Sequence, residues 1–264
     1  MDRILLFIPG YNCERQITRV LSQLDHEMLR YISEVIVVNN RSTDHTEQAV
    51  LNYVSKVKLP LVLLRNDENY GLGGSHKVAF DYAQSNGFNY IIVLHGDDQG
   101  DIHDIMPILK SGEYKLFDCC LGARFMKDSR LKGYSKFRTF GNRVYNILFS
   151  ISTGRRIFDL GSGLNMYRVD ILNSRFYQKF SDNLMFNCYM LLANALMNFN
   201  VKFFPISWRE DDQVSNVRMF SQAMRTLKIA SGYFFSKDKK KYMNSEFRVT
   251  MVSEYTAKKI NSAE

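Results

Sequence analysis

The sequence predicts a single α/β domain in which helices flank a mostly parallel sheet. Short apolar runs alternate with stretches of helical periodicity through the first half of the 264-residue chain. These runs are apolar almost throughout, as in strands that are covered on both faces. A polar cluster also follows each of the first four runs. Because no linker rich in Pro, Gly or Ser divides the chain, we expect one domain over residues 1–235 and a basic C-terminal extension over 236–264.

The first half of the chain contains four expected strands, at residues 4–8, 34–38, 61–64 and 90–94. A helix is expected after each of the first three strands. The first helix has apolar residues on one face, at Ile17, Val20, Leu21, Leu24 and Met28. The second helix opens with Asp44 three residues before Glu47, which is the spacing of a capping box. Gly71 to Gly74 lead into the third helix.

The second half of the chain is less regular. We expect a strand within 118–125, a helix that ends at Gly154, a buried helix that enters a strand within 184–204, and an amphipathic helix over 217–235. Asparagines interrupt the apolar stretch at 184–204. No segment therefore reaches the roughly 18–20 apolar residues of a membrane span.

The charge balance favours anionic partners, because 35 basic residues face 27 acidic ones for a net charge of +8. The basic residues are scattered apart from the run "KDKKKY" at 237–242, which does not favour nucleic acid as a partner. The four cysteines have no C-x-x-C spacing, and the apolar start is too short for a signal peptide. We expect a soluble protein of the reducing cytoplasm, with peripheral contact at the inner face of the membrane left open.

Polar clusters follow the first four expected strands, where ligands bind in parallel sheets. They are "PGYNCE", "NNRSTD", "NDENYGLGG" and "HGDDQGD". The glycines of the third cluster, Gly71 and Gly74 among them, fit either a backbone that passes close to a nucleotide or a turn into the helix. Each cluster alone is typical of a loop, but four at one edge of a sheet indicate a binding site.

The fourth cluster places three carboxylates within five residues, which repel one another unless they are protonated or neutralised by a cation. Oxygen ligands of this kind suit Mg²⁺ or Mn²⁺. On an extended segment His95, Asp97 and Gln99 project to one side, and Asp97 is the strongest metal-ligand candidate. His95 is equally consistent with a structural hydrogen bond, and Asp101 with a cap on a helix at 102–110.

Six motifs in the order of the chain carry a resemblance to a known family. They are "IPGYNCERQI", "EVIVVNNRSTDHT", "NYGLGGSHKVAF", "HGDDQGDIHDI", "LGARF" and "FDLGSGLNMYRVDIL". Over roughly residues 4 to 210 the set resembles the family 2 glycosyltransferases of the GT-A (Rossmann-like) fold. The likeness is strongest to the branch of dolichyl- and polyprenyl-phosphate glycosyltransferases.

The resemblance implies roles for particular residues. The residues expected around the nucleotide are Pro9, Tyr11, Asn12, Glu14, Asn39, Asn40, Ser42, Gly71 and Gly74. The metal is expected on Asp97, with Gln99 and His95 assisting. The catalytic residues are expected to be Asp97, Asp159, Arg124 and Arg138, with both arginines facing a phosphate. The acceptor is expected beside Ser162, Asn142, Trp208 and Arg209.

Four positions depart from the family pattern. Asn39 and His95 each stand where the family has an aspartate. Asn165 replaces an arginine, and Gly161 replaces a threonine. Near the last cluster, Trp208 fits either stacking on a sugar or base, or a place in the core. Arg209 fits either a contact with a phosphate, or a surface pair with Glu210 or Asp211.

The implied reaction is an inverting transfer from a nucleotide-diphosphate sugar, aided by Mg²⁺ or Mn²⁺, in the synthesis of cell-envelope polysaccharide or glycoconjugate. A polyprenyl phosphate acceptor is already an anion and needs no base. A glycan hydroxyl needs one, for which Asp159, Asp182 and Asp211 are candidates. The alternatives are a non-catalytic nucleotide-sugar-binding scaffold and a sugar nucleotidyltransferase, although "PGYNCERQI" is not the glycine- and arginine-rich loop that the latter has after its first strand.

Overall fold

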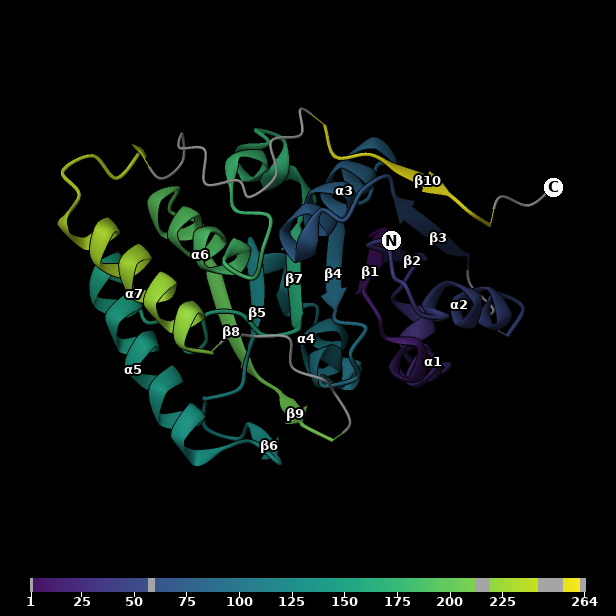
Figure 1. Cartoon of the computed structure of the whole chain (residues 1–264), viewed down its shortest axis with the longest axis horizontal. Helices are drawn as coiled ribbons and strands as arrows, with labels where there is room; N and C mark the ends of the chain where they lie inside the picture. Colours follow the sequence, from purple (N-terminus) through teal and green to yellow (C-terminus); the bar gives the residue numbers. More distant parts are fainter. Residues whose placement is uncertain (1, 57–59, 212–218, 242–253, 262–264) are drawn as a thin grey trace.

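The computed structural model describes residues 2–56, 60–211, 219–241 and 254–261. A large sheet runs through the centre of the molecule in the strand order β10-β3-β2-β1-β4-β7-β5-β8 (Figure 1). Its strands are β1 (Ile4–Gly10), β2 (Glu34–Asn39), β3 (Leu61–Asn66), β4 (Tyr90–Leu94), β5 (Cys119–Ala123), β7 (Leu164–Arg168), β8 (Val201–Pro205) and β10 (Ala257–Lys259). The mixed α/β domain predicted from the sequence is confirmed.

The first four strands are parallel to one another and form the part of the sheet that was predicted from the apolar runs. Strands β1 and β4 are buried along their whole length. Their side chains alternate between two cores, because successive residues of a strand point to opposite faces. Leu5 and Phe7 enter one core, and Ile4 and Leu6 enter the other.

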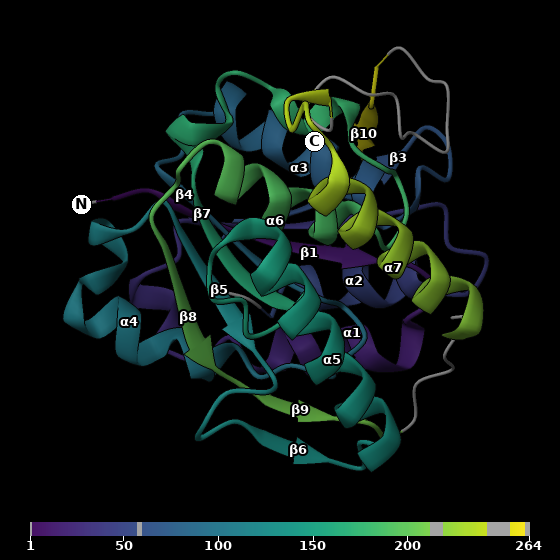
Figure 2. The ribbon, with the colours of Figure 1, turned by 90° about the vertical axis from the view of Figure 1, so that its left-hand side faces the viewer.

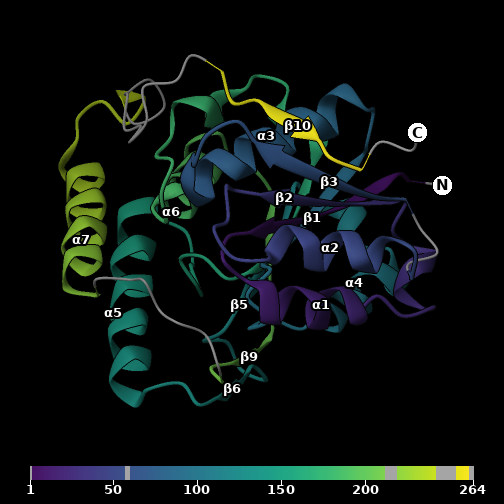
Figure 3. The same cartoon turned by 45° about the vertical axis from the view of Figure 1, so that its right-hand side comes forward.

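Helices cover both faces of the sheet (Figures 1 and 3). They are α1 (Glu14–Ser22), α2 (Thr46–Val54), α3 (Gly71–Ser85), α4 (Met106–Ser111), α5 (Lys136–Thr153), α6 (Phe186–Leu196) and α7 (Met219–Phe235). Helices α3 and α6 pack on one face, and α1, α2 and α4 pack on the other. Helices α5 and α7 lie side by side at the end of the sheet that carries β8 (Figures 2 and 3).

The capping box predicted for α2 is wrong. The helix begins at Thr46, and the carboxylate of Asp44 accepts hydrogen bonds from the backbone N–H groups of Thr46 (3.0 Å) and Glu14 (3.1 Å). Glu47 binds Arg65, whose Nε lies 2.7 Å from its carboxylate. A charged partner on the neighbouring strand gives Glu47 a stronger interaction than a backbone N–H of its own helix would.

Several strands were not predicted from the sequence, β7 among them. Strand β7 lies antiparallel between β4 and β5, and its register pairs Asn165 with both Val93 and Leu121. Asn165 and Arg168 interrupt its apolar pattern, which is why the pattern did not indicate a strand. A short two-stranded ribbon of β6 (Arg130–Lys132) and β9 (Ser207–Arg209) stands beside the first turn of α5 (Figure 2).

The boundary expected at residue 235 does not separate two structural units. Strand β10 extends the sheet antiparallel to β3, and Tyr255 is buried against α3. The three β10 residues read "AKK", so no apolar pattern marked them as a strand. The part of 236–264 that the structure describes thus includes a portion of the domain itself. None of the helices that the structure describes is long and apolar enough to span a bilayer.

Candidate active site

The loops that follow β1 and β2 are joined to each other at the carboxyl edge of the sheet. The backbone N–H of Asn12 donates to Ser42 Oγ (3.0 Å), and the backbone N–H of Thr43 donates to Asn12 Oδ1 (2.8 Å). Asn12 has a φ of 49°, a conformation that asparagine tolerates better than most residues. Tyr11 is exposed beside it. This arrangement presents the Tyr11 ring to solvent at the place where ligands bind in parallel sheets.

Pro9 and Glu14 accept hydrogen bonds that join neighbouring loops at this edge of the sheet. The carbonyl of Pro9 accepts a hydrogen bond from Gly96 N–H (3.1 Å), which joins the end of β1 to the turn after β4. Glu14 opens α1, and its carboxylate accepts a hydrogen bond from the backbone N–H of His45 (3.4 Å).

Asn39 and Asn40 are buried and use their amides within the protein. Asn39 accepts from the backbone N–H of Ser42 (2.9 Å) and donates to Glu47 (3.0 Å). Asn40 accepts from the backbone N–H of Tyr70 (2.9 Å) and donates to Asn69 (2.7 Å). Asn40 therefore ties the loop after β2 to the start of α3.

The glycines at the start of α3 are required by packing within the chain. Gly71 has a φ of 70°, and a Cβ at this position would lie 2.5 Å from the carbonyl oxygen of Asp182. A Cβ at Gly74 would overlap the side chain of Tyr70. Of the two alternatives for these glycines, the structure shows the turn into the helix, together with a close approach to the loop that carries Asp182.

Asp98 is neutralised by arginines that the sequence analysis did not assign to it. Its buried carboxylate accepts from Arg19 Nε (2.6 Å), from Gln23 (3.2 Å) and from the guanidinium of Arg209. Of the two alternatives for Arg209, the surface pair with Glu210 or Asp211 is wrong, because the Arg209 guanidinium binds Asp98. Two cations thus offset part of the repulsion in the acidic cluster, and Asp98 is a structural anchor.

Asp97 lies next to Asp98 in the acidic cluster and is the metal-ligand candidate predicted from the sequence. Residues 96–98 form a turn in which Asp98 has a φ of 60°, so the extended geometry expected for His95, Asp97 and Gln99 is wrong. Burial raises the pKa of Asp97 to about 6, although its carboxylate accepts a hydrogen bond from the backbone N–H of Gln99 (3.3 Å). The third aspartate, Asp101, accepts from the backbone N–H of His103 (3.0 Å), so its predicted cap is confirmed.

His95 is partly buried and lies beside the buried His76, with ring centroids 6.3 Å apart. Burial lowers the pKa of His95 to about 4, so the ring is neutral near pH 7. Its Nε2 is buried without a hydrogen-bond partner in the described part of the chain. The structural hydrogen bond considered for this side chain is therefore not made at Nε2.

The donor set fits a metal that takes most of its ligands from a substrate. No group of three or more His, Cys, Asp or Glu side chains is arranged as a metal cage within the residues that the structure describes. Mg²⁺ commonly binds proteins through one or two carboxylates and fills its shell with phosphate oxygens and water. Asp97 offers such a carboxylate, and the orphaned Nε2 of His95 is a further nitrogen close by in the sequence.

Arg124 and Asp159 form a buried, bidentate pair. Arg124 Nε and Nη2 each lie 2.8 Å from the carboxylate of Asp159, and Nη2 also donates to the carbonyl of Gly161 (3.0 Å). The guanidinium carbon lies 5.0 Å from the ring centre of Trp208. Trp208 is buried, in agreement with the core alternative. Arg124 is thus fixed on several sides, and Nη1 is the part of its guanidinium that no described residue occupies.

Arg138 stands on the first turn of α5 and is held by Glu210. Its Nη1 lies 2.6 Å and 2.8 Å from the two carboxylate oxygens, and its guanidinium carbon lies 4.5 Å from the ring centre of Tyr134. Asn142, one helical turn further on, donates to the Tyr134 hydroxyl (3.0 Å). Glu210 is a site residue that the sequence analysis mentioned only as a surface partner.

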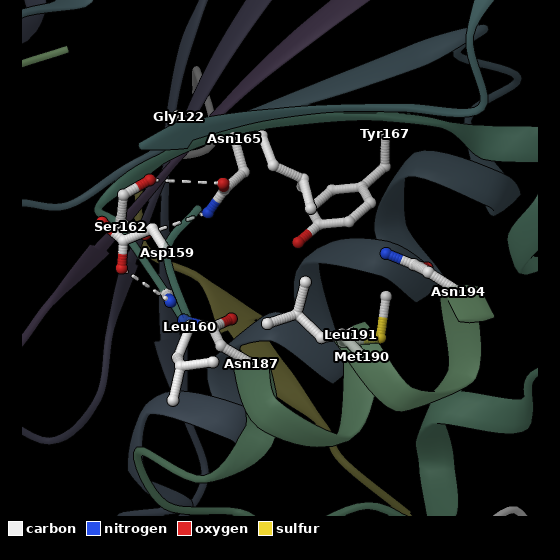
Figure 4. A pocket seen from close by; sticks show the side chains of 12 residues that line it. Gly122, Asp159, Leu160, Ser162, Asn165, Tyr167, Asn187, Met190, Leu191 and Asn194 are labelled. Atoms are coloured by element: carbon white, nitrogen blue, oxygen red, sulfur yellow. Dashed lines mark hydrogen bonds between the residues drawn. The ribbon is translucent and has the colours of Figure 1, made fainter. Parts of the chain in front are cut away.

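Ser162 lines a small pocket between β5, β7 and α6 (Figure 4). Its hydroxyl faces the carbonyl of Leu164 (3.0 Å) and Asn165 Oδ1 (3.3 Å), while Asn165 Nδ2 donates to the Ser162 carbonyl (2.9 Å). Asn165 therefore closes a local turn at the position where the family has an arginine. The acceptor role of Ser162 stays a prediction.

Asp98→Asn is expected to destabilise the fold. The amide keeps the shape and tolerates the left-handed backbone, but the charge-assisted bonds to Arg19 and Arg209 are lost. We expect the free energy of unfolding to fall by about 2 kcal/mol. Urea denaturation followed by circular dichroism measures this difference. An unchanged midpoint would show that the two arginines are satisfied by solvent and do not anchor the turn.

The family model of glycosyl transferase family 2 matches residues 6–176, which span β1 to the region after β7. The chain belongs to glycosyl transferase family 2. The match includes the loops after β1, β2 and β4, the acidic cluster and Arg124.

The chain is also similar to curated proteins of other organisms. An uncharacterized protein of Methanocaldococcus jannaschii is 30% identical over 186 residues, covering 68% of this chain and 76% of that protein. A dodecaprenyl-phosphate galacturonate synthase of Rhizobium johnstonii is 26% identical over 169 residues, covering 63% of this chain. The aligned part spans only 48% of the Rhizobium protein.

Solved structures confirm the GT-A fold. Glucosyl-3-phosphoglycerate synthase of Mycobacterium tuberculosis, in complex with UDP, superposes with a TM-score of 0.61 at 14% identity, covering 90% of this chain and 82% of that one. TarS of S. aureus in complex with UDP-GlcNAc gives a TM-score of 0.57 at 16% identity, covering 93% and 71%. The mycobacterial enzyme has also been solved with Mn²⁺ and UDP-glucose.

Proposed function

We propose that this chain is an inverting glycosyltransferase that moves a sugar from a nucleotide-diphosphate sugar to a polyprenyl phosphate, in the synthesis of cell-envelope polysaccharide or glycoconjugate. Family 2 membership supports sugar transfer. Relatives named for dodecaprenyl and undecaprenyl phosphate support the acceptor class. Structural neighbours solved with UDP and UDP-GlcNAc support the donor class.

The observation that carries the choice of acceptor is the state of the candidate bases. Asp159 is bound on both oxygens by Arg124, and Asp182 is buried against Lys77 (2.6 Å). Asp211 lies 3.6 Å from Lys132 at the surface. A sugar hydroxyl must lose a proton to a base as it attacks, whereas a phosphate oxygen is already anionic. Two of the three candidate carboxylates, Asp159 and Asp182, are thus already engaged by cations, which favours polyprenyl phosphate over a glycan acceptor.

On the donor side, Tyr11 and the loop after β2 form the proposed nucleotide site. The exposed Tyr11 ring offers a face on which a base stacks. Asn12 and Ser42, which hydrogen-bond to each other's loops, fix this edge before a ligand arrives. A preorganised edge loses less entropy on binding than a loose loop does.

Asp97, assisted by Gln99 and His95, would hold Mg²⁺ or Mn²⁺ together with the diphosphate of the donor. When bound, the cation supplies positive charge against the leaving diphosphate. Arg124 and Arg138 would face the acceptor or leaving phosphate with the guanidinium edges that Asp159 and Glu210 do not occupy. Those two carboxylates keep the arginines in place, so no reorganisation is needed when negative charge develops. Asn142 would add an amide nearby.

Thermal-shift measurements with UDP, GDP, CDP and dTDP, each with Mg²⁺ or Mn²⁺, test the donor site. A ligand that binds only the native state raises the melting temperature by mass action. We expect at least one nucleoside diphosphate to raise it, and the metal to increase the effect. If no nucleotide shifts the transition with either metal, the proposed donor site is wrong.

Transfer assays then separate the proposed function from its alternatives. Each nucleotide that binds is supplied as its sugar conjugates, with a polyprenyl phosphate or an oligosaccharide as acceptor. Product on the polyprenyl phosphate supports the proposal, and product on the oligosaccharide alone overturns the acceptor. Binding without any transfer indicates a nucleotide-sugar-binding scaffold. Release of pyrophosphate from a nucleoside triphosphate and a sugar phosphate indicates a nucleotidyltransferase.

A further inference from the structure

Helix α5 turns an apolar face to solvent. Its large exposed side chains follow one another at intervals of three and four residues, at Phe137, Phe140, Val144, Ile147 and Ile151. Residues at this spacing lie on one side of a helix. Phe137 is 82% exposed and Ile151 is 60% exposed, so the stripe extends over nearly the full length of the helix. Soluble proteins normally place such a stripe toward their core.

Helix α7 continues this surface. Its exposed apolar residues are Met224, Leu227, Phe234 and Phe235. The Tyr145 hydroxyl donates to the carbonyl of Ala223 (3.1 Å), and the Ser152 hydroxyl lies 3.2 Å from the carbonyl of Ala230. From the first contact to the second, both helices advance by seven residues in the same direction. Helices α5 and α7 therefore run parallel (Figure 3). We call the exposed apolar residues of both helices the α5–α7 face.

The charges around the α5–α7 face are predominantly positive. Neither helix contains an aspartate or glutamate, whereas Lys136, Arg143, Arg225 and Lys228 are exposed on them. Directly after α7 come Lys237, Lys240 and Lys241, also exposed, with Asp238 as the lone acid of residues 219–241. Apolar side chains flanked by basic ones match the surface of a membrane that contains anionic lipids.

A second copy of the chain fits this face less well. A symmetric dimer would bring the same patch of both copies together. Arginine and lysine would then meet arginine and lysine, without acids on either helix to pair with them, and like charges at an interface disfavour association. An anionic lipid surface has the complementary charge and also accepts the exposed phenylalanines.

The α5–α7 face begins at the proposed acceptor site. Arg138 and Asn142 belong to the first turns of α5, and Phe137 and Phe140 are their neighbours on the exposed side. A lipid phosphate whose chain stays in the bilayer would reach these polar groups without leaving the membrane. We propose that the α5–α7 face docks on an anionic membrane surface and presents the acceptor site to lipid phosphates. The purpose of this docking rests on the proposed function, but the docking itself does not.

Vesicle co-sedimentation without any nucleotide sugar tests the docking. The full chain is mixed with vesicles of phosphatidylcholine that contain phosphatidylglycerol, and with vesicles of phosphatidylcholine alone. We expect preferential binding to the anionic vesicles, and weaker binding when the salt concentration is raised about tenfold. The double variant Phe140→Ser and Ile147→Ser is expected to bind the anionic vesicles at least about tenfold more weakly than the unchanged protein. Leu116→Ser is the matched control, because Leu116 is 69% exposed but lies outside both helices.

Three further results decide between explanations. Circular dichroism should show the double variant folded, since both replaced side chains are exposed. Transfer to a water-soluble short-chain prenyl phosphate should be retained, while transfer to long-chain acceptor in vesicles should fall. If that activity is absent in the unchanged protein although vesicles are bound, the proposed function fails and the docking stands. Equal vesicle binding by all variants overturns the docking. So does a dimer in sedimentation velocity that the double variant dissociates.

Discussion

Asp97→Asn is expected to lower kcat/KM for sugar transfer by about 10²–10³-fold. The amide fills the same space but lacks the negative charge that would hold the cation against the donor diphosphate. A loss of several kcal/mol of charge stabilisation in the transition state corresponds to this factor. Initial rates at saturating Mn²⁺ measure the effect. Asp97 is partly buried, and desolvation raises its pKa, so its negative charge opposes folding at neutral pH. Its replacement should therefore leave the melting temperature unchanged or raised.

Asp101→Asn is the matched control for this experiment. The same substitution four residues further on removes a charge from the same loop, yet an asparagine still caps the backbone at His103. We expect transfer close to that of the unchanged protein. Nucleotide binding should respond to Mn²⁺ in the Asp101 variant and not in the Asp97 variant. Transfer by the Asp97 variant within about threefold of the original would remove Asp97 from the catalytic residues.

Lys77→Met is expected to produce the largest loss of stability. Lys77 is fully buried, and its Nζ donates to Asp182 (2.6 Å), to the carbonyl of Phe180 (2.7 Å) and to the hydroxyl of Tyr255 (3.0 Å). Methionine fills the space but leaves a buried carboxylate without its cation. Breaking a buried pair in this way costs about 3–5 kcal/mol. For a chain of this size the melting temperature should fall by on the order of 10 °C.

A second substitution distinguishes the lost charge from poor packing. In the double variant Lys77→Met and Asp182→Asn the buried charge is gone as well, and much of the lost stability should return. Lys110→Met is the surface control, because its pair with Glu27 (2.5 Å) is about half exposed. That change should alter the free energy of unfolding by no more than about 1 kcal/mol. A double variant no more stable than Lys77→Met alone would show that packing is responsible.

The sequence predicted the part of the fold that depends on apolar patterning. Buried parallel strands such as β1 and β4 need side chains that are apolar on both faces, and such runs are visible in the sequence. Strand β7 contains Asn165, which finds its hydrogen bonds in a turn at Ser162. Strand β10 is an edge strand whose lysines face solvent. Neither strand requires a continuous apolar run, so the sequence pattern predicted neither of them.

The sequence predicted which loops lie together at the edge of the sheet, but not which side chains form ion pairs there. The four polar clusters do lie at one edge because strand direction alone brings them there. The partners of Asp98, Arg124 and Arg138 depend on contacts between residues far apart in the chain. Arg209 is 111 residues from Asp98, and Glu210 is 72 residues from Arg138. Spacing along the sequence contains no signal for such pairs.

The two arginines that bind Asp98 are synthesised at very different times during translation. Arg19 has left the ribosome before Asp98 is synthesised, but Arg209 follows 111 residues later. At translation rates of about 5–20 residues per second, roughly 6–22 s pass before the second cation exists. During that time the acidic turn carries a charge that only Arg19 can offset. We expect a nascent chain that ends before β9 to protect this turn poorly from proteases, even when its parallel strands have already formed.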